Sequence, residues 1–82
     1  MFSKLSQKYK TSTVTVDLGF QPDFCSVYFV DTTYNHGSVY TNGVITAKNG
    51  LLDIKSITDN ILTFTVRSDY LTLLISIVAT NL

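Results

Sequence analysis

Two residues of this 82-residue chain are of the types that serve as nucleophile and general base: its single cysteine, Cys25, and its single histidine, His36. Catalysis by such a pair needs both side chains within hydrogen-bonding reach of each other, with a third group orienting the base. Cys25 alternates with Val27 and Phe29 in an apolar pattern, which favours a small buried side chain over a reactive thiol. His36 falls in the polar segment 32–37, where a lone histidine is expected to be solvated. We therefore predict that the protein is not an enzyme.

The other groups that could carry chemistry are dispersed along the chain. The six acids are all aspartates, and most fall at expected strand ends and turns, where a carboxylate bonds the nearby backbone. Their spacing does not indicate the carboxylate pair of a glycosidase. The glycines form neither a phosphate-binding loop nor a dinucleotide fingerprint, and no cluster of Cys and His has the spacing of a zinc site. The sequence thus predicts no catalytic residue, no cofactor and no metal ion.

Charge and hydropathy narrow the range of partners. Six basic and six acidic residues give a formal net charge of zero, so the chain lacks the basic footprint of a nucleic-acid binder. No window reaches the roughly 20 apolar residues that span a bilayer, and residues 1–8 lack the apolar core of a signal peptide. We expect a soluble protein made in a reducing cytoplasm. Because one cysteine cannot form an internal disulfide, oligomerisation or docking on a larger body is the expected source of extra stability.

The elements that position these residues are predicted to be strands. From Ser12 onward, apolar and polar residues alternate with a period of two, as in half-buried strands. Pro22 interrupts the pattern between a strand over 13–18 and a second over 24–31. The residues that share one face of the first strand are Val14, Val16 and Leu18. In the second strand, those expected to face away from the core are Ser26, Tyr28 and Val30.

Three turn signals follow, at Asn42-Gly43, Asn49-Gly50 and Asp59-Asn60. Asn-Gly suits the type I′ turn, which needs positive φ at both central residues. The three signals predict hairpins that join consecutive strands into a meander, and a closing strand follows over 71–80. About seven short strands predict an all-β fold, a small antiparallel β-sandwich or partly open barrel.

The first eleven residues differ from the rest of the chain. They carry Lys4, Lys8 and Lys10 without an acid, and we divide the chain into an N-terminal arm, 1–11, and a single β-sandwich domain, 12–82. Two interpretations of the arm stay open. It is either a loosely ordered tail, or an arm that lies on a neighbouring subunit with Phe2 and Leu5 as its anchors.

Two further features indicate contact with other protein. In the closing strand, Leu74 and Val78 make the face opposite the core partly apolar, so this strand is covered either by its own chain or by a neighbouring subunit. Tyr28 faces outward, and tyrosine is enriched in interfaces. Aromatic residues also line sugar-binding surfaces, and ordinary cross-strand pairing of tyrosines is a further possibility. The residues that would form such a ligand site are Tyr34, His36 and Tyr40.

The stretch 14–24, Val-Thr-Val-Asp-Leu-Gly-Phe-Gln-Pro-Asp-Phe, resembles a recurrent element of small β-sandwich domains in virion proteins of tailed bacteriophages. Such domains, in tail-fibre, baseplate and head-decoration proteins, often open with a strand, then Gly-Phe-x-Pro, then a second apolar strand. The segment 57–64 and the long apolar closing strand are also similar to them. The resemblance implies a structural component of a phage particle, located in the virion after synthesis in the host cytoplasm.

We therefore expect a non-enzymatic assembly protein that binds the capsid or tail surface, as a decoration or minor capsid protein. Its expected partners are capsid or tail subunits, within a homo-oligomer or a larger assembly, and not nucleic acid or a membrane. The predicted contact residues are Phe2, Leu5, Tyr28, Leu74 and Val78. The alternative is a monomeric carbohydrate- or ligand-binding module that uses Tyr34, His36 and Tyr40.

Overall fold

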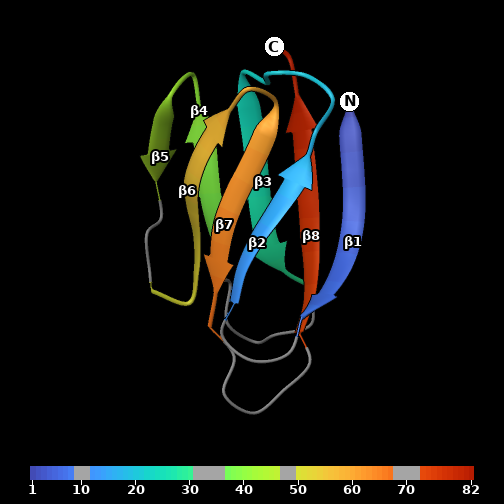
Figure 1. Ribbon diagram of the computed structural model, residues 1–82, viewed down its shortest axis with the longest axis vertical. Helices are drawn as coiled ribbons and strands as arrows, with labels where there is room; N and C mark the ends of the chain where they lie inside the picture. The colour runs from blue at the N-terminus through green and yellow to red at the C-terminus, as the bar shows by residue number, and fades with distance from the viewer. Residues whose placement is uncertain (9–11, 31–36, 47–49, 68–72) are drawn as a thin grey trace.

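Every secondary-structure element in the described part of the chain is a β-strand. The structure, a computed structural model, describes residues 1–8, 12–30, 37–46, 50–67 and 73–82. Its eight antiparallel strands form two sheets, which confirms the predicted all-β sandwich (Figure 1). The strands are β1 Phe2–Lys8, β2 Ser12–Asp17, β3 Phe24–Phe29, β4 Gly37–Thr41, β5 Val44–Thr46, β6 Leu52–Thr58, β7 Ile61–Val66 and β8 Leu73–Thr80.

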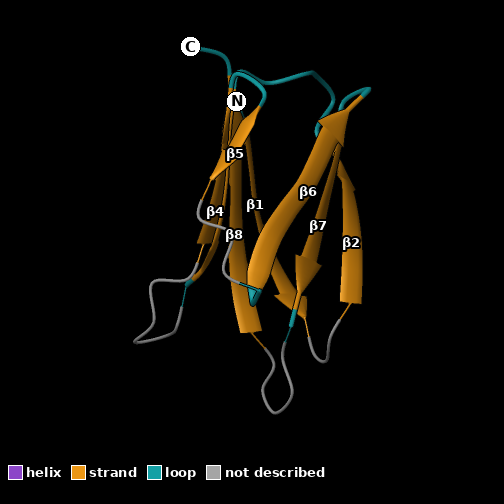
Figure 2. Cartoon of the chain, turned by 90° about the vertical axis from the view of Figure 1, so that its left-hand side faces the viewer, coloured by secondary structure: helices purple, strands orange, loops and turns teal. Residues whose placement is uncertain are grey.

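The two sheets differ in width. The five-stranded sheet has the order β1-β8-β3-β4-β5, and the three-stranded sheet has the order β2-β7-β6. Figure 2 shows the two layers packed face to face. Because three strands cannot cover five, the outermost strands of the wider sheet, β1 and β5, extend beyond the narrower one (Figure 1).

Two of the three predicted hairpins are confirmed. Asn42 and Gly43, with φ of 47° and 88°, join β4 to β5. Asp59 and Asn60, with φ of 53° and 69°, join β6 to β7. Positive φ at both central residues is the mark of a type I′ turn, whose twist matches that of the strands it joins.

The third hairpin, predicted at Asn49-Gly50, is wrong. β5 pairs with β4 in the wider sheet, whereas β6 pairs with β7 in the narrower one, and Asn49 itself lies outside the described residues. The chain passes between sheets here because a meander confined to one sheet would leave its apolar face uncovered. The crossing instead buries Leu52 and Ile54 of β6 between the layers.

The core fills the space between the sheets and follows the predicted alternation. In β3 the odd-numbered residues are buried, while Tyr28 and Val30 on the other side are exposed. The closing strand behaves in the same way, because its odd-numbered residues from Ile75 to Ala79 have no exposed surface. The buried apolar residues are Val14, Val16, Leu18, Cys25, Val27, Phe29, Leu52, Ile54, Ile57, Leu62, Phe64, Val66, Ile75, Ile77 and Ala79.

The N-terminal segment differs from its prediction as a tail or arm, because residues 2–8 form the edge strand β1. β1 pairs with β8 in one unbroken register, from Phe2 opposite Ala79 to Lys8 opposite Leu73. This pairing satisfies backbone N–H and C=O groups of β8 that would otherwise have no strand beside them. β1 carries no one-sided apolar alternation, since the three-stranded sheet does not cover it and Lys4 on its inner side is exposed.

One buried polar side chain links the two sheets. Ser38, on the inner face of β4, has no exposed surface. Its Oγ accepts a hydrogen bond from the Ile54 amide of β6 at 3.1 Å and donates to the Thr46 carbonyl of β5 at 3.2 Å. The Ile54 amide lies where the pairing of β6 with β7 shifts register, between Ile54 and Ser56. Ser38 therefore supplies a hydrogen-bond acceptor to the Ile54 amide at this register shift.

Candidate functional site

Most of the predicted contact residues lie together on the outer face of the five-stranded sheet. Strand alternation and register define this outer face, because every second residue of each strand points away from the three-stranded sheet. The described residues on the outer face are Ser3, Leu5, Phe24, Ser26, Tyr28, Gly37, Val39, Thr41, Val44, Thr46, Leu74, Ser76, Val78 and Thr80. None of these fourteen positions carries a charge.

The register brings residues far apart in the sequence into adjacent rows of the outer face. Leu5 of β1 and Tyr28 of β3 both lie opposite Ser76 of β8, one on each side of it. Val78 lies two residues further along β8, between Ser3 and Ser26. Strands in a sheet are about 4.8 Å apart, so four of the five predicted contact residues belong to one continuous surface.

Exposed apolar side chains concentrate on this face. In the described part of the chain, the large hydrophobic residues that are exposed comprise the end residues Met1 and Leu82 and four others. Three of the four are on the outer face, namely Leu5 at 62%, Val44 at 60% and Tyr28 at 41% exposed. The fourth is Val30, which extends β3 and whose amide donates to the Leu74 carbonyl at 2.9 Å.

Tyr28 lies flat against the sheet rather than projecting from it. Its partner across β3 and β4 is Gly37, and a methyl group added at Gly37 would collide with the Tyr28 ring. The ring thus covers the glycine, a packing that restores side-chain contact where glycine provides none. The Tyr28 ring therefore lies over Gly37 on the outer face.

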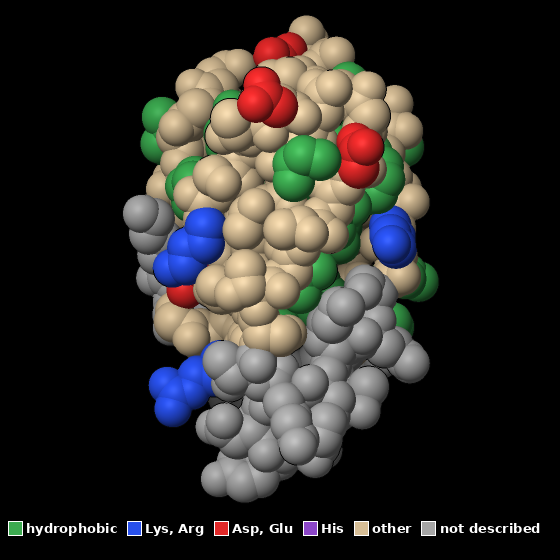
Figure 3. Space-filling view, viewed as in Figure 1, with side chains coloured by type: hydrophobic (Ala, Val, Ile, Leu, Met, Phe, Trp, Pro, Cys, Tyr) green, Lys and Arg blue, Asp and Glu red, His purple; other side chains and the backbone are tan. Residues whose placement is uncertain are grey.

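The face of the three-stranded sheet has a different character. Its central positions are hydroxyl side chains, with Thr13 opposite Thr65 and Thr15 opposite Thr63. Figure 3, which looks onto this face, shows few hydrophobic side chains over its centre, acidic groups towards one end and basic groups at the sides. The two faces of the sandwich therefore differ in both charge and polarity.

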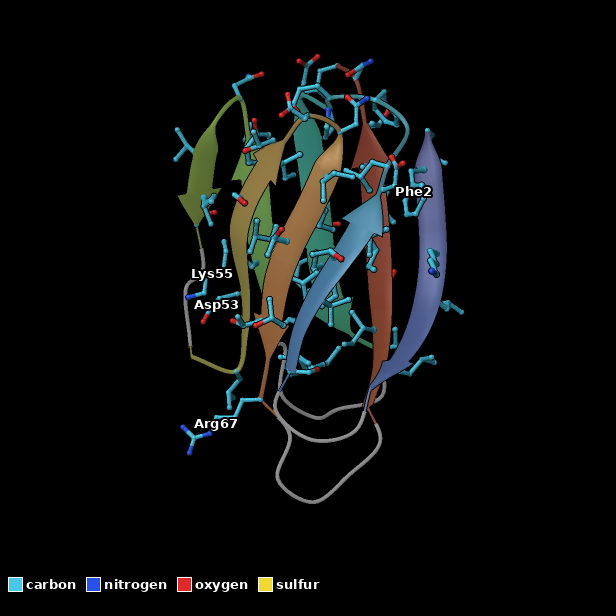
Figure 4. The ribbon with its side chains drawn as sticks, in the orientation of Figure 1. Phe2, Asp53, Lys55 and Arg67 are labelled. Carbon is cyan, nitrogen blue, oxygen red and sulfur yellow. The ribbon has the colours of Figure 1, made fainter. Side chains whose placement is uncertain are left out.

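Phe2 does not belong to the outer face. It is half-buried and packs against the core, and Figure 4 shows it between β1 and the end of β2. Asp53, Lys55 and Arg67 lie at the opposite side of the sandwich, beside β6 (Figure 4). These three charged side chains therefore lie away from the outer face.

Only one of the three residues of the alternative ligand site, Tyr40, lies in the described part of the chain. Tyr34 and His36 lie outside the described residues. Tyr40 is half-buried on the inner side of β4 and packs against the core. Gln21 Nε2 donates to Tyr40 Oη at 3.3 Å and to the Ile57 carbonyl at 3.1 Å, so the Gln21 side chain connects Tyr40 of one sheet to β6 of the other.

Cys25 is buried in the core with no exposed surface, as the sequence predicts. Burial raises the pKa of the Cys25 thiol from its ordinary value of 9.0 to about 11, because ionisation in an apolar environment is unfavourable. A thiol that is neutral and enclosed at pH 7 is a poor nucleophile. Among the described residues no three His, Cys, Asp or Glu side chains are placed to hold a metal ion, and no helix is long and apolar enough to cross a membrane.

Sequence reasoning missed the contributions of Phe24, Val39 and Val44 to the outer face. The signal for the last two was present, because a two-residue type I′ turn at Asn42-Gly43 sets Val39 and Val44 on the same side of their hairpin. Comparison of the chain with protein-family models, curated proteins and solved structures finds no match. The class defined by the fold and the candidate site is an antiparallel β-sandwich with one uncharged, partly apolar outer face.

Proposed function

We propose that this protein is a non-enzymatic structural protein of a phage virion, which binds the capsid or tail surface through the outer face of its five-stranded sheet. The observation that carries the proposal is the convergence of Leu5, Tyr28, Leu74 and Val78 on one face without charged residues. Interface centres are depleted of charge and enriched in aromatic residues. The resemblance of segment 14–24 to virion β-sandwich domains supports a phage particle as the binding partner.

The size of the outer face explains why such a protein would act in many copies. Five strands about 4.8 Å apart, each about six residues long at roughly 3.3 Å per residue, give a face of about 500 Å². Contact over the whole face would bury about 1,000 Å² in total from both partners, which is below the ~1,200–2,000 Å² of stable specific interfaces. One face alone thus supports weak binding, and attachment at repeated, neighbouring sites strengthens it.

The test uses purified particles of the phage that encodes the chain. Trypsin cleaves after Lys55 and Arg67, so peptide 56–67 reports the protein in banded particles by mass spectrometry. We expect this peptide at a fixed ratio to the major capsid or tail protein. Its absence from particles, with the protein present in the infected cell, would contradict the proposal.

A matched pair of variants tests the face. Val78→Lys places a charge in the middle of the outer face, and Thr15→Lys places one on the exposed face of the opposite sheet. Each variant is added to particles that lack the protein. We expect the Thr15→Lys variant to bind like the unmodified chain and the Val78→Lys variant to lose at least tenfold in affinity. Equal binding by both variants would exclude the outer face as the contact.

A further inference from the structure

β1 is an uninterrupted edge that no described element covers. It stands at the end of the five-stranded sheet and pairs over all seven residues with β8, without a register shift. It contains no proline or glycine. The unpaired backbone N–H and C=O groups along such an edge are a template for one more strand.

The other edges of the sandwich are less suitable for pairing. β5 has three residues, and β6 has the register shift at Ile54 and Ser56 that disrupts a regular edge. The edge of β2 is set back, because β1 of the wider sheet extends past it (Figure 1). An approaching strand therefore reaches β1 before it reaches β2.

We propose that β1 pairs with β1 of a second copy of this chain, antiparallel about a twofold axis at Leu5. The two five-stranded sheets then become one sheet of ten strands, joined by β1 and its symmetry mate. A twofold axis makes the contact self-complementary, so the assembly closes as a dimer.

The positions of the lysines favour one register for pairing with a second copy. With the axis at Leu5, Lys4 lies opposite Ser6 of the second copy and Lys8 lies opposite Phe2, so no like charges meet directly. Like charges placed directly opposite each other destabilise a strand pair. An axis at Lys4 would place Lys4 opposite itself, and an axis at Ser6 would place Lys4 opposite Lys8.

Registers further from the centre lose most of the pairing. An axis at Ser3 or at Gln7 leaves three of the seven residues of β1 opposite a partner residue. The register centred on Leu5 uses the full strand, and alternate pairs across it exchange about six to eight backbone hydrogen bonds in total. It is thus the longest twofold register, and the only one pairing more than three residues of β1 that opposes no lysines.

Pairing at this edge also makes the two outer faces continuous. Leu5 of one copy lies beside Leu5 of the other, and the combined face covers about 1,000 Å², above the ~800 Å² that each partner of a standard interface contributes. The dimer itself does not depend on the proposed virion function, because it is measured with the purified chain alone.

The decisive variant is Leu5→Cys. Directly opposed residues of an antiparallel pair have Cα atoms about 4.5–5.5 Å apart, within the about 4.4–6.8 Å that a disulfide spans. Mild oxidation should convert this variant to a disulfide-linked species of twice the 9.1 kDa chain mass on non-reducing gels. The native Cys25 is buried, so the unmodified chain should remain monomeric on the same gel.

Ser3→Cys is the matched control, because it lies on the same strand and face and is also exposed. In the proposed register Ser3 lies opposite position 7, so two copies of residue 3 are four residues apart, about 13 Å along the strand, and cannot be bridged. Mixing Ser3→Cys with a Gln7→Cys variant should restore the cross-link. Cross-linking of Ser3→Cys alone, or none for Leu5→Cys, would overturn the register.

A non-covalent measurement completes the test. Leu5→Lys places two ammonium groups together at the axis and should raise the dimer dissociation constant at least tenfold in sedimentation or light scattering. Val44→Lys on β5, at 60% exposure against 62% for Leu5, should leave the constant unchanged. An unmodified chain that stays monomeric at several hundred micromolar, or equal effects of the two lysines, would refute the proposal.

Discussion

Replacing Ser38 with alanine should destabilise the protein by far more than the loss of one hydroxyl group on the surface. Ser38 Oγ is the acceptor, at 3.1 Å, for the amide of Ile54, and both residues are enclosed between the sheets with at most 1% of their surface exposed. Alanine at position 38 leaves that buried amide without this acceptor, and water has no access to replace it. The other partner, the Thr46 carbonyl, belongs to an exposed residue and can bond water instead.

The magnitude follows from this asymmetry. A buried donor that loses its acceptor costs about 1–3 kcal/mol, whereas the carbonyl that can turn to water contributes little. We therefore expect the free energy of unfolding to fall by about 2 kcal/mol. For a domain of this size that corresponds to a decrease in Tm of about 8–16 °C, and it is a large share of a total stability of about 4–12 kcal/mol.

The assay is urea unfolding of the unmodified chain and of two alanine variants, Ser38→Ala and Ser26→Ala. Ser26 sits on the neighbouring strand β3, one residue out of step with Ser38 and on the outer face, so Ser26→Ala should change stability by less than about 0.5 kcal/mol. Amide exchange should also accelerate at Ile54 in Ser38→Ala. Equal midpoints for the two variants would refute the assignment of Ser38 as the link between the sheets.

Three further substitutions test the turn, the outer face and the core. Asn60 has φ of 69°, so Asn60→Gly should raise the free energy of unfolding, measured in urea, by a few tenths of a kcal/mol, whereas Asn60→Ala should lower it by about 1 kcal/mol. Gly37→Ala should destabilise the fold by about 1–3 kcal/mol, because the new methyl group collides with the Tyr28 ring; in the background of Tyr28→Ala the same change should cost much less. The unfolded Cys25 thiol ionises above pH 9.0, while the folded thiol keeps its proton to about pH 11. The unmodified chain should therefore keep its full advantage in free energy of unfolding over Cys25→Ala below pH 9. This advantage should fall by about 2 kcal/mol as the pH rises to 11. A constant difference in free energy of unfolding across this range would contradict the burial of the thiol.

The parts of the fold that could be predicted are those that local sequence specifies. Period-two alternation identifies which side of a strand is buried, and the inward positions of Cys25 and Val27 followed from it. Type I′ turns are encoded in two residues, so the hairpins at Asn42-Gly43 and Asp59-Asn60 were also predictable. Neither signal depends on which strands become neighbours.

The remaining features depend on pairing between distant segments. Alternation gives the face of a strand but not its sheet, which is why the sequence wrongly predicts a hairpin at Asn49-Gly50. β1 was missed for a related reason. Its partner β8 is about seventy residues away in sequence, with Leu5 opposite Ser76, and an edge strand left uncovered by the second sheet has no one-sided apolar pattern to reveal it.

The candidate site combines both kinds of information. That Tyr28 faces outward, and that Leu74 and Val78 oppose the core face of their strand, could be inferred from each strand separately. That they share one surface with Leu5 follows only from the order β1-β8-β3. The assignment of Phe2 as an arm anchor lacked this information, and in the structure its ring packs against the core.

The lack of charge on the outer face has no explanation in the stability of the folded chain. Leu5 and Val44 are 62% and 60% exposed, and exchanging such surface residues for lysine usually changes stability by less than about 0.5 kcal/mol. The absence of charge at the fourteen described outward positions therefore adds little to folding, while the exposed apolar side chains among them increase the risk of aggregation. A surface of this kind is accounted for when another protein covers it. The edge of β1 is a separate contact, where the spacing of Lys4 and Lys8 favours pairing with a second copy of the chain in the full-length register centred on Leu5.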